Sequence, residues 1–434
     1  MTRKKFHLGY FTKFGATSWP CARDAFGSQW ADGSYHIELA KQLEAAKFDF
    51  ILFEDTVMVA DRYGGSKELD LKHAVLSPKN DPIPLLPLMA QGTSHIGLIA
   101  TASTTFYPPY LLARLFSTVD SLTRGRAGWN IVTSSETNAA ANFGMDKLLP
   151  PTVRYDIADE YVELCNKLWD SWEEDALVAD PESGVYVDHT KVHTVNFAGK
   201  HFKCRGPLNT LRSPQGRPVL CQAGASERGR DFSAKNAQVI LGMMTGGVAG
   251  MKAYREDLRR RAECFGRNPD DIKVFFLTPV TILPEGVSKR EMTEAEKINA
   301  FEHNIVMASS SLDIDFSLYD PDAPVPQDLT AGGHTSALDH MKKAGREEGA
   351  TLRDLFATEK GSSGMDFSGT AQQVADKLMA VMDEVGGDGF IIEGSGYNHQ
   401  LPDLVNGVIP ALQRAGAVRT EYLGKNFGAV LREF

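Results

Sequence analysis

Residues 126–144 read RAGWNIVTSSETNAAANFG, and this stretch decides how the rest of the chain is interpreted. It begins as a strand, because Trp129 and the β-branched run 131–133 favour extended backbone. The hydroxyl, amide and carboxylate side chains of residues 134–138 follow, and they cannot lie in a core without hydrogen-bond partners. A buried parallel strand that ends in polar side chains is typical of the carboxyl-terminal rim of a barrel, where chemistry is placed. The same residues also fit an ordinary loop that caps the next helix.

Strand-like and helix-like segments alternate along the whole chain, which indicates an α/β fold built on parallel strands. The predicted strands cover residues 6–11, 48–53, 96–105, the start of the quoted stretch, 218–223, 239–243, 272–283 and a run beginning at 389. The predicted helices cover residues 35–46, 85–91, a segment ending at 122, 157–169, a segment starting at 226, 251–262, 370–386 and 401–415. Eight strand–helix units make a TIM (β/α)8 barrel the simplest fold, although the pattern alone leaves a doubly wound sheet open.

Two long segments interrupt this alternation, and we expect both to be insertions at the carboxyl-terminal rim of a single domain, residues 1–434. Residues 173–214 are predicted to form hairpins and loops. Residues 284–369 are rich in Gly, Asp and Pro, and we expect a lid over the substrate that is helical around residues 289–304. A contact between subunits is the alternative. Residues 417–434 are left as a C-terminal tail.

Charge and composition exclude several classes of function. The net charge of −10 argues against a nucleic acid or an anionic membrane surface as the partner. The chain has no C-x-x-C pair, and its five cysteines lie at positions 21, 165, 204, 221 and 264. Neither a disulfide framework nor a zinc ribbon is therefore indicated. The first residues, MTRKKFHLGYF, lack the apolar run of a signal peptide, and no run of about 18 apolar residues occurs. We therefore expect a reduced, soluble, cytoplasmic protein.

Polar side chains stand at the ends of the second, third and fourth predicted strands. They are Asp55, Thr101, Ser103, Asn130 and Thr133. Strand ends meet at one mouth of a barrel, so we expect these side chains to converge there. Each residue also has an ordinary structural interpretation, because aspartate caps loops and threonine favours strands.

A turn between a predicted strand and a predicted helix, residues 224–230, reads GASERGR. Gly224 permits a tight turn, and Ser226 is placed to cap the start of the helix. Free backbone N–H groups and the positive end of the helix dipole form a ready anion site. The alternative is an ordinary cap, in which the Ser226 hydroxyl needs no ligand.

The spacing of His189 and His193 would place two imidazoles on one face of a helix, as in some metal sites. The two histidines flank Thr-Lys-Val in a segment of strand-like Val and Tyr residues, and no third ligand is near them in the sequence. We therefore predict a structural hairpin here and no metal site.

Eight blocks of sequence carry a resemblance that covers nearly the whole chain. They are KFDFILFED (47–55), ATASTTFYPPYLLAR (100–114), GRAGWNIVTS (125–134), NFG (142–144), VRYDIADEY (153–161), GPLNTLRSPQGRPVLCQAGASERGR (206–230), DGFIIEG (388–394) and RTEYLGKNFGAVLREF (419–434). In these blocks the chain resembles the nitrilotriacetate monooxygenase component A group of the bacterial luciferase-like superfamily. The group consists of two-component, FMN-dependent monooxygenases, and dibenzothiophene sulfone monooxygenase belongs to it.

The resemblance implies a TIM barrel that uses reduced FMN and O2 to oxidise or cleave a small organic substrate. The implied FMN contacts are Asp55, Thr101, Ser103, Asn130, Thr133, Tyr155 and Ser226. The turn at Ser226 would hold the phosphate of FMN. Asn130 and Thr101 correspond to residues near the flavin atom at which oxygen reacts, so these two are the predicted catalytic residues.

The sequence has neither a G-x-G-x-x-G segment after a strand nor a P-loop, so nothing indicates a dinucleotide or ATP site. Reduced FMN is therefore expected from a separate NAD(P)H:FMN reductase, in agreement with the two-component habit of the family. A homodimer or homotetramer is also expected.

Three departures from the family pattern concern histidines. Pro151 stands where a histidine often precedes the Arg-Tyr pair, Ser135 stands where one relative has a histidine, and residues 18–26 read SWPCARDAF where many relatives have Trp-Arg-His. Because a histidine exchanges protons near neutral pH, the loss of all three changes what the site can do to a substrate. Within the group we expect a heteroaromatic, riboflavin-like substrate. The alternatives are hydride transfer with a deazaflavin and a flavin-binding protein without catalysis.

Overall fold

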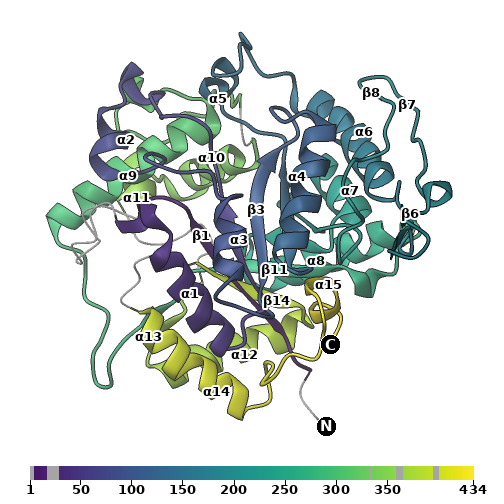
Figure 1. Cartoon of the computed structure of the whole chain (residues 1–434). Helices are drawn as coiled ribbons and strands as arrows, with labels where there is room; N and C mark the ends of the chain where they lie inside the picture. Colours follow the sequence, from purple (N-terminus) through teal and green to yellow (C-terminus); the bar gives the residue numbers. More distant parts are fainter. Residues whose placement is uncertain (1–3, 17–28, 333–334, 358–364, 394–399) are drawn as a thin grey trace.

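Eight parallel strands close into a barrel in the order β1-β14-β11-β10-β9-β4-β3-β2 (Figure 1). Their bounds are β1 (His7–Lys13), β2 (Phe50–Glu54), β3 (Gly97–Ser103), β4 (Ala127–Val132), β9 (Val219–Gln222), β10 (Val239–Gly242), β11 (Lys273–Thr278) and β14 (Gly389–Glu393). The computed structural model describes residues 4–16, 29–332, 335–357, 365–393 and 400–434. The predicted α/β fold, a TIM (β/α)8 barrel, is confirmed.

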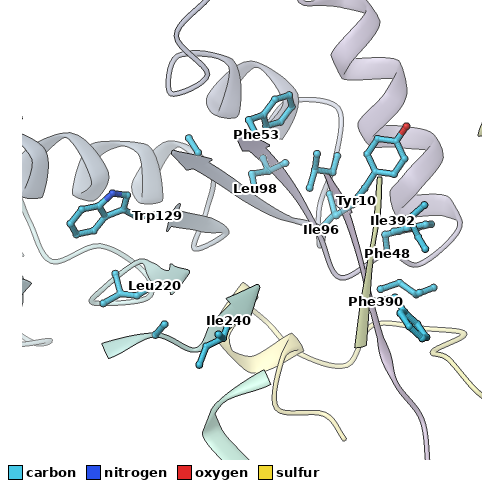
Figure 2. Close-up of a cluster of buried hydrophobic side chains, with 14 of the residues drawn as sticks. Tyr10, Phe48, Phe53, Ile96, Leu98, Trp129, Leu220, Ile240, Phe390 and Ile392 are labelled. Atoms are coloured by element: carbon cyan, nitrogen blue, oxygen red, sulfur yellow. The ribbon is translucent and has the colours of Figure 1, made fainter. Parts of the chain in front are cut away.

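Helices cover the outside of the barrel, one or more after each strand. They are α1 (Ser34–Ala45), α3 (Leu85–Ala90), α4 (Pro109–Leu122), α6 (Pro151–Trp169), α7 (Glu227–Asn236), α8 (Gly247–Cys264), α12 (Ala371–Val385) and α14 (Ile409–Arg414). Alternate residues of a strand face opposite sides, so one set of strand side chains points outward and packs against the helices. Ile51 and Phe53 belong to the large cluster between strands and helices. Figure 2 shows other members of that cluster, among them Trp129, Leu220 and Phe390.

The barrel interior is filled by the other set of strand residues. Phe50, Leu52, Ile99 and Phe275 form a separate buried cluster with residues of the C-terminal tail. Phe427, in α15 (Phe427–Val430), is fully buried in that cluster. A Cβ on Gly97, the first residue of β3, would lie 2.4 Å from the Phe427 ring, so only glycine fits there. The tail therefore closes the amino-terminal end of the barrel, which leaves the carboxyl-terminal mouth for chemistry.

A buried charge network joins the tail to the first two strands. Asp49 accepts hydrogen bonds from Arg419 Nη2 at 2.5 Å and from the Leu8 N–H at 2.7 Å, and its carboxylate contacts His7 Nδ1 at 2.7 Å. Burial opposes ionisation of Asp49, but His7 and Arg419 hold its pKa below the usual value. Lys273 Nζ also donates to the Phe434 carbonyl at 2.9 Å.

The first insertion contains two short antiparallel hairpins. They are β5 (Leu177–Asp180) with β6 (Val185–Val187), and β7 (Phe197–Ala198) with β8 (Lys203–Cys204). His193 lies between them, and its Nε2 contacts Glu173 Oε1 at 2.6 Å. Within the described part of the chain, no group of three His, Cys, Asp or Glu residues is arranged to hold a metal ion.

The long excursion contains α9 (Glu294–Leu312), α10 (Thr335–Glu348) and α11 (Leu352–Phe356). These helices share a small core with Phe316 and Leu329. Val306 and neighbouring residues pack instead against the segments that follow β2 and β4. In Figure 1 these helices gather with α2 (Glu68–His73), away from the two chain termini. The excursion therefore lies over part of the barrel mouth, and its role as a lid stays a prediction.

Several predicted element boundaries were wrong. The helix predicted at residues 157–169 begins at Pro151. The seventh strand ends at Thr278, because Pro279 has no N–H to donate to the barrel ladder. The next residues form β12 (Thr281–Ile282), which pairs with β13 (Ser368–Gly369) at the far end of the excursion. The excursion helix begins at Glu294 and not near 289, because Thr293 and Glu296 form a capping box.

None of the helices in the described ranges is long and apolar enough to cross a membrane.

Candidate functional site

The predicted polar residues lie at the carboxyl-terminal ends of neighbouring strands. Asp55 follows β2, Thr101 and Ser103 are in β3, Asn130 is in β4 and Thr133 comes directly after it. Because β2, β3 and β4 are adjacent and parallel, these ends form one sector of the mouth. The barrel rather than local sequence brings the residues to the same rim.

Thr101 and Asn130 are in direct contact. Thr101 Oγ1 donates to the Phe53 carbonyl at 2.8 Å and accepts from Asn130 Nδ2 at 2.9 Å. Both side chains are buried, and Asn130 Oδ1 has no hydrogen-bond partner among the residues that the structure describes. A buried amide oxygen without a donor is costly, so a ligand that offers an N–H or O–H at this position would relieve the cost. Thr101 and Asn130 therefore offer an acceptor oxygen to a ligand at the barrel mouth.

The next residues along β3 and β4 form a second contact. Ser103 Oγ and Ser134 Oγ lie 2.8 Å apart, and Ser134 has a positive φ of 61°. Thr105 Oγ1 donates to the Thr133 carbonyl at 2.8 Å. Thr133 thus contributes its main chain to these contacts.

Asp55 lies in a cluster of ionisable groups beside β2. Lys79 Nζ donates to both Glu54 carboxylate oxygens, at 2.8 and 2.9 Å, and its side chain is almost fully buried. Burial raises the pKa of Asp55 to about 7; Lys79 opposes the shift, and Glu54 and Asp81 add to it. Burial, Asp81 and Asp55 together raise the pKa of Tyr107 to about 12. Asp55 therefore changes its charge near neutral pH.

Ser226 caps α7, as predicted, because its Oγ accepts from the Gly229 N–H at 3.1 Å. Tyr155, on α6, reaches the same turn. A Cβ on Gly229 would lie 3.0 Å from Tyr155 Oη and 3.1 Å from Ser226 Oγ. Two hydroxyls and the start of a helix of ten residues thus surround one glycine. This arrangement can bind an anion through backbone N–H groups and hydroxyl donors.

Two residues of this turn were missed from the sequence. Gln222, the last residue of β9, donates from Nε2 to Tyr155 Oη at 3.2 Å. Tyr254 Oη, from α8, donates to the Gly224 carbonyl at 2.6 Å. Gln222 could have been predicted from the sequence, because it is a polar residue at the end of a predicted strand, like the other site residues. Tyr254 lies inside a helix, and no local pattern indicates its contact.

The departures from the family pattern have structural roles of their own. Pro151 is the first residue of α6, a position where proline is favoured because its missing N–H costs nothing. Ser135 Oγ donates to Glu136 Oε1 at 2.6 Å. Residues 18–26 lie outside the described part of the chain. In place of an imidazole, the chain thus has a proline that begins a helix at position 151 and a serine hydroxyl that binds a neighbouring glutamate at position 135.

Comparison with known proteins identifies the family of the chain. The sequence model of the family described as luciferase-like monooxygenase matches residues 6–389. The chain belongs to the luciferase-like monooxygenase family. It is 35% identical to nitrilotriacetate monooxygenase component A of Aminobacter aminovorans, over 97% of this chain and 95% of the relative. The enzyme is therefore an oxidoreductase of the monooxygenase class.

Solved structures extend the likeness to the fold. A long-chain alkane monooxygenase superposes with a TM-score of 0.84 at 33% identity, over 99% of this chain and 96% of the other. A riboflavin lyase, solved with modified FMN and riboflavin, superposes with a TM-score of 0.83 at 28% identity. The match covers 99% of this chain and 96% of the lyase. The predicted resemblance to the nitrilotriacetate monooxygenase component A group is thus confirmed.

Proposed function

We propose that the enzyme binds reduced FMN at the mouth and uses O2 to oxidise or cleave a small organic substrate. The buried Asn130 Oδ1 without a donor, beside Thr101, carries this proposal. The edge of a flavin ring is a row of donors and acceptors, so it can supply the missing donor. Asp55 and Ser103 stand at the same rim for further contacts with the ring.

The phosphate of FMN fits the turn before α7. Ser226, Tyr155 and the N–H groups at the start of α7 would hold it, and Gly229 leaves room between the two hydroxyls. Reduced FMN supplies the electrons and the site of oxygen activation when it is bound. The chain itself orients the ring through Asn130 and Thr101 and excludes water from the mouth.

A separate NAD(P)H:FMN reductase would supply the reduced flavin. The sequence carries no dinucleotide-binding fingerprint, so the enzyme has no hydride source of its own. The relative named component A is by its name one part of a larger system, which supports this division of labour.

The substrate we propose is a heteroaromatic compound of the riboflavin type. Pro151 and Ser135 replace histidines of relatives, so the site has fewer groups for proton transfer. The likeness to a riboflavin lyase supports a ring system as the substrate. A panel of riboflavin, other flavins, sulfones and alkanes would separate this choice from the substrates named for other relatives.

Isotope and anaerobic experiments test the reaction class. NADH alone should give no product, whereas NADH with an unrelated FMN reductase should. Under labelled O2, one heavy oxygen should enter the product or the fragment that is released. If the ring is cleaved and the heavy oxygen is recovered in water and not in the product, the reaction is an oxidative cleavage. Product formed without O2 from previously reduced FMN would refute both outcomes and favour hydride transfer.

A further inference from the structure

A cavity of about 330 Å³ lies beside the mouth, between the amino-terminal ends of α4 and α6. Its lining comes from the segment after β3, the loop before α6, the first turns of α6 and Phe202 of the first insertion. The lining residues that the argument uses are Phe106, Tyr107, Pro108, Arg154, Ile157 and Phe202. No carboxylate is among these described residues, and one cation is. The volume lies within the range of sites for small molecules.

That cation, Arg154, forms no ion pair with a carboxylate of the described residues. It is only 7% exposed, its Nη1 donates to the Leu149 carbonyl at 2.5 Å, and its Nε has no hydrogen-bond partner in the same part of the chain. Glu136, the acid that acts on Arg154 electrostatically, is bound to Ser135. Burial lowers the pKa of the guanidinium, because desolvation disfavours its charged form.

Each of the other buried arginines among the described residues has a carboxylate partner or donates from all three of its guanidinium nitrogens, although Arg419 Nε has no hydrogen-bond partner there. Arg255 forms two hydrogen bonds of 2.9 Å with Asp388, and Arg419 binds Asp49 and Glu433. Arg126 has no acidic partner but donates from Nε, Nη1 and Nη2 to carbonyl and hydroxyl oxygens at 2.7–3.5 Å. Among these four arginines, only Arg154 combines an unused donor with the lack of a hydrogen-bonded carboxylate in the described residues, and it lines a cavity.

An anionic ligand would satisfy this arginine. The planar fork of a guanidinium matches a carboxylate, and such charge-assisted bonds are stronger than neutral ones. The rest of the cavity is aromatic and aliphatic, including Phe106, Pro108 and Ile157, which requires an apolar body on the ligand. A phosphate or a polyacid would leave most of this wall without contacts.

We propose that this cavity is a binding site for a small apolar monocarboxylate, whose acid group pairs with Arg154 and whose body packs on the cavity wall. Tyr107 connects the site to the mouth, because it lines the cavity and its pKa is raised by burial and by the nearby carboxylates Asp81 and Asp55. The ligand is either a second substrate or an effector. Binding can be measured without flavin, so the proposal stands apart from the assignment of FMN.

Calorimetric titration of the flavin-free enzyme with 3-phenylpropionate and octanoate tests the site, with 3-phenylpropionamide and octanamide as neutral controls. Each acid should bind at least about tenfold more tightly than its amide. Arg154→Met should remove this difference, and Arg154→Lys should keep part of it. Phe202→Ala should weaken the acid and the amide alike. Arg114→Met, on the exposed face of α4, is the matched control and should change neither.

Several results would overturn the proposal. Equal binding of acid and amide, no binding of either acid, or unchanged acid binding in Arg154→Met would each do so. Loss of FMN but not of riboflavin binding in Arg154→Met would assign the arginine to the flavin phosphate instead. If Arg154→Met does not fold, Arg154→Lys and Phe202→Ala still test both halves of the site. Consumption of the bound acid under turnover identifies a substrate, and recovery unchanged identifies an effector.

Discussion

Asp55 offers the sharpest test of the electrostatics at the mouth. Burial raises the pKa of its carboxyl from the usual 3.8 to about 7. The folded chain therefore holds this proton up to about pH 7, whereas the unfolded chain releases it near pH 4. Between these values the unfolded chain binds fewer protons, so stability falls as the pH rises. At about 1.36 kcal/mol per pKa unit, the ionised carboxylate costs at most about 4 kcal/mol above pH 7.

Asp55→Asn removes this titration and keeps the size of the side chain. The stability of D55N relative to the wild type should therefore rise by about 2–3 kcal/mol between pH 5 and pH 8, and then level off. Urea unfolding of the flavin-free protein at each pH measures this difference. The control is Asp328→Asn, an exposed carboxylate in the excursion, whose stability difference should not depend on pH in the same way. A D55N difference that stays constant from pH 5 to pH 8 would refute the reasoning.

Three further perturbations test other parts of the molecule. Ser226→Asp places a negative charge beside the proposed phosphate site, so a fluorescence titration should show a much larger loss for FMN than for riboflavin; equal losses would contradict the assignment. Phe427→Ala should lower the free energy of unfolding by about 3–5 kcal/mol, because it empties the base of the barrel, whereas Leu423→Ala, at a 72% exposed side chain, should change it little. Glu302→Ala removes the acceptor of Lys72 and His73, at 2.6 and 2.5 Å, and should speed proteolysis of the excursion while FMN affinity is kept. Unchanged proteolysis would show that this contact does not hold the excursion in place.

The alternating strands and helices could be predicted because their signals are local, whereas the choice of a barrel over a doubly wound sheet came from the family resemblance. Alternation in the strands and the 3.6-residue period in the helices both depend on near neighbours in the chain. The end of β11 was mispredicted because Thr281 and Ile282 continue an apolar run past Pro279. Those two residues pair with β13, which lies beyond the whole excursion. No local pattern encodes that pairing.

The site was predictable to the extent that it depends on strand ends. Thr101 and Asn130 stand on neighbouring strands in register, so a parallel barrel brings them into contact. Arg154 could not be found in this way. Its burial depends on the loop before α6, whose Leu149 carbonyl accepts from the guanidinium. A charged residue on an amphipathic helix is ordinarily exposed, and only the tertiary structure shows that this one is not.

The lost histidines do not leave the mouth without a group that titrates near neutral pH. Asp55 has a pKa of about 7, which lies close to that of an unperturbed imidazole. The cause is different, however, because burial next to Glu54 and Asp81 produces the shift and Lys79 limits it. An acid of this kind is neutral below pH 7 and can then donate a hydrogen bond, and above pH 7 it can only accept one. The same position thus offers either role to a ligand bound at the mouth, and the pH decides which.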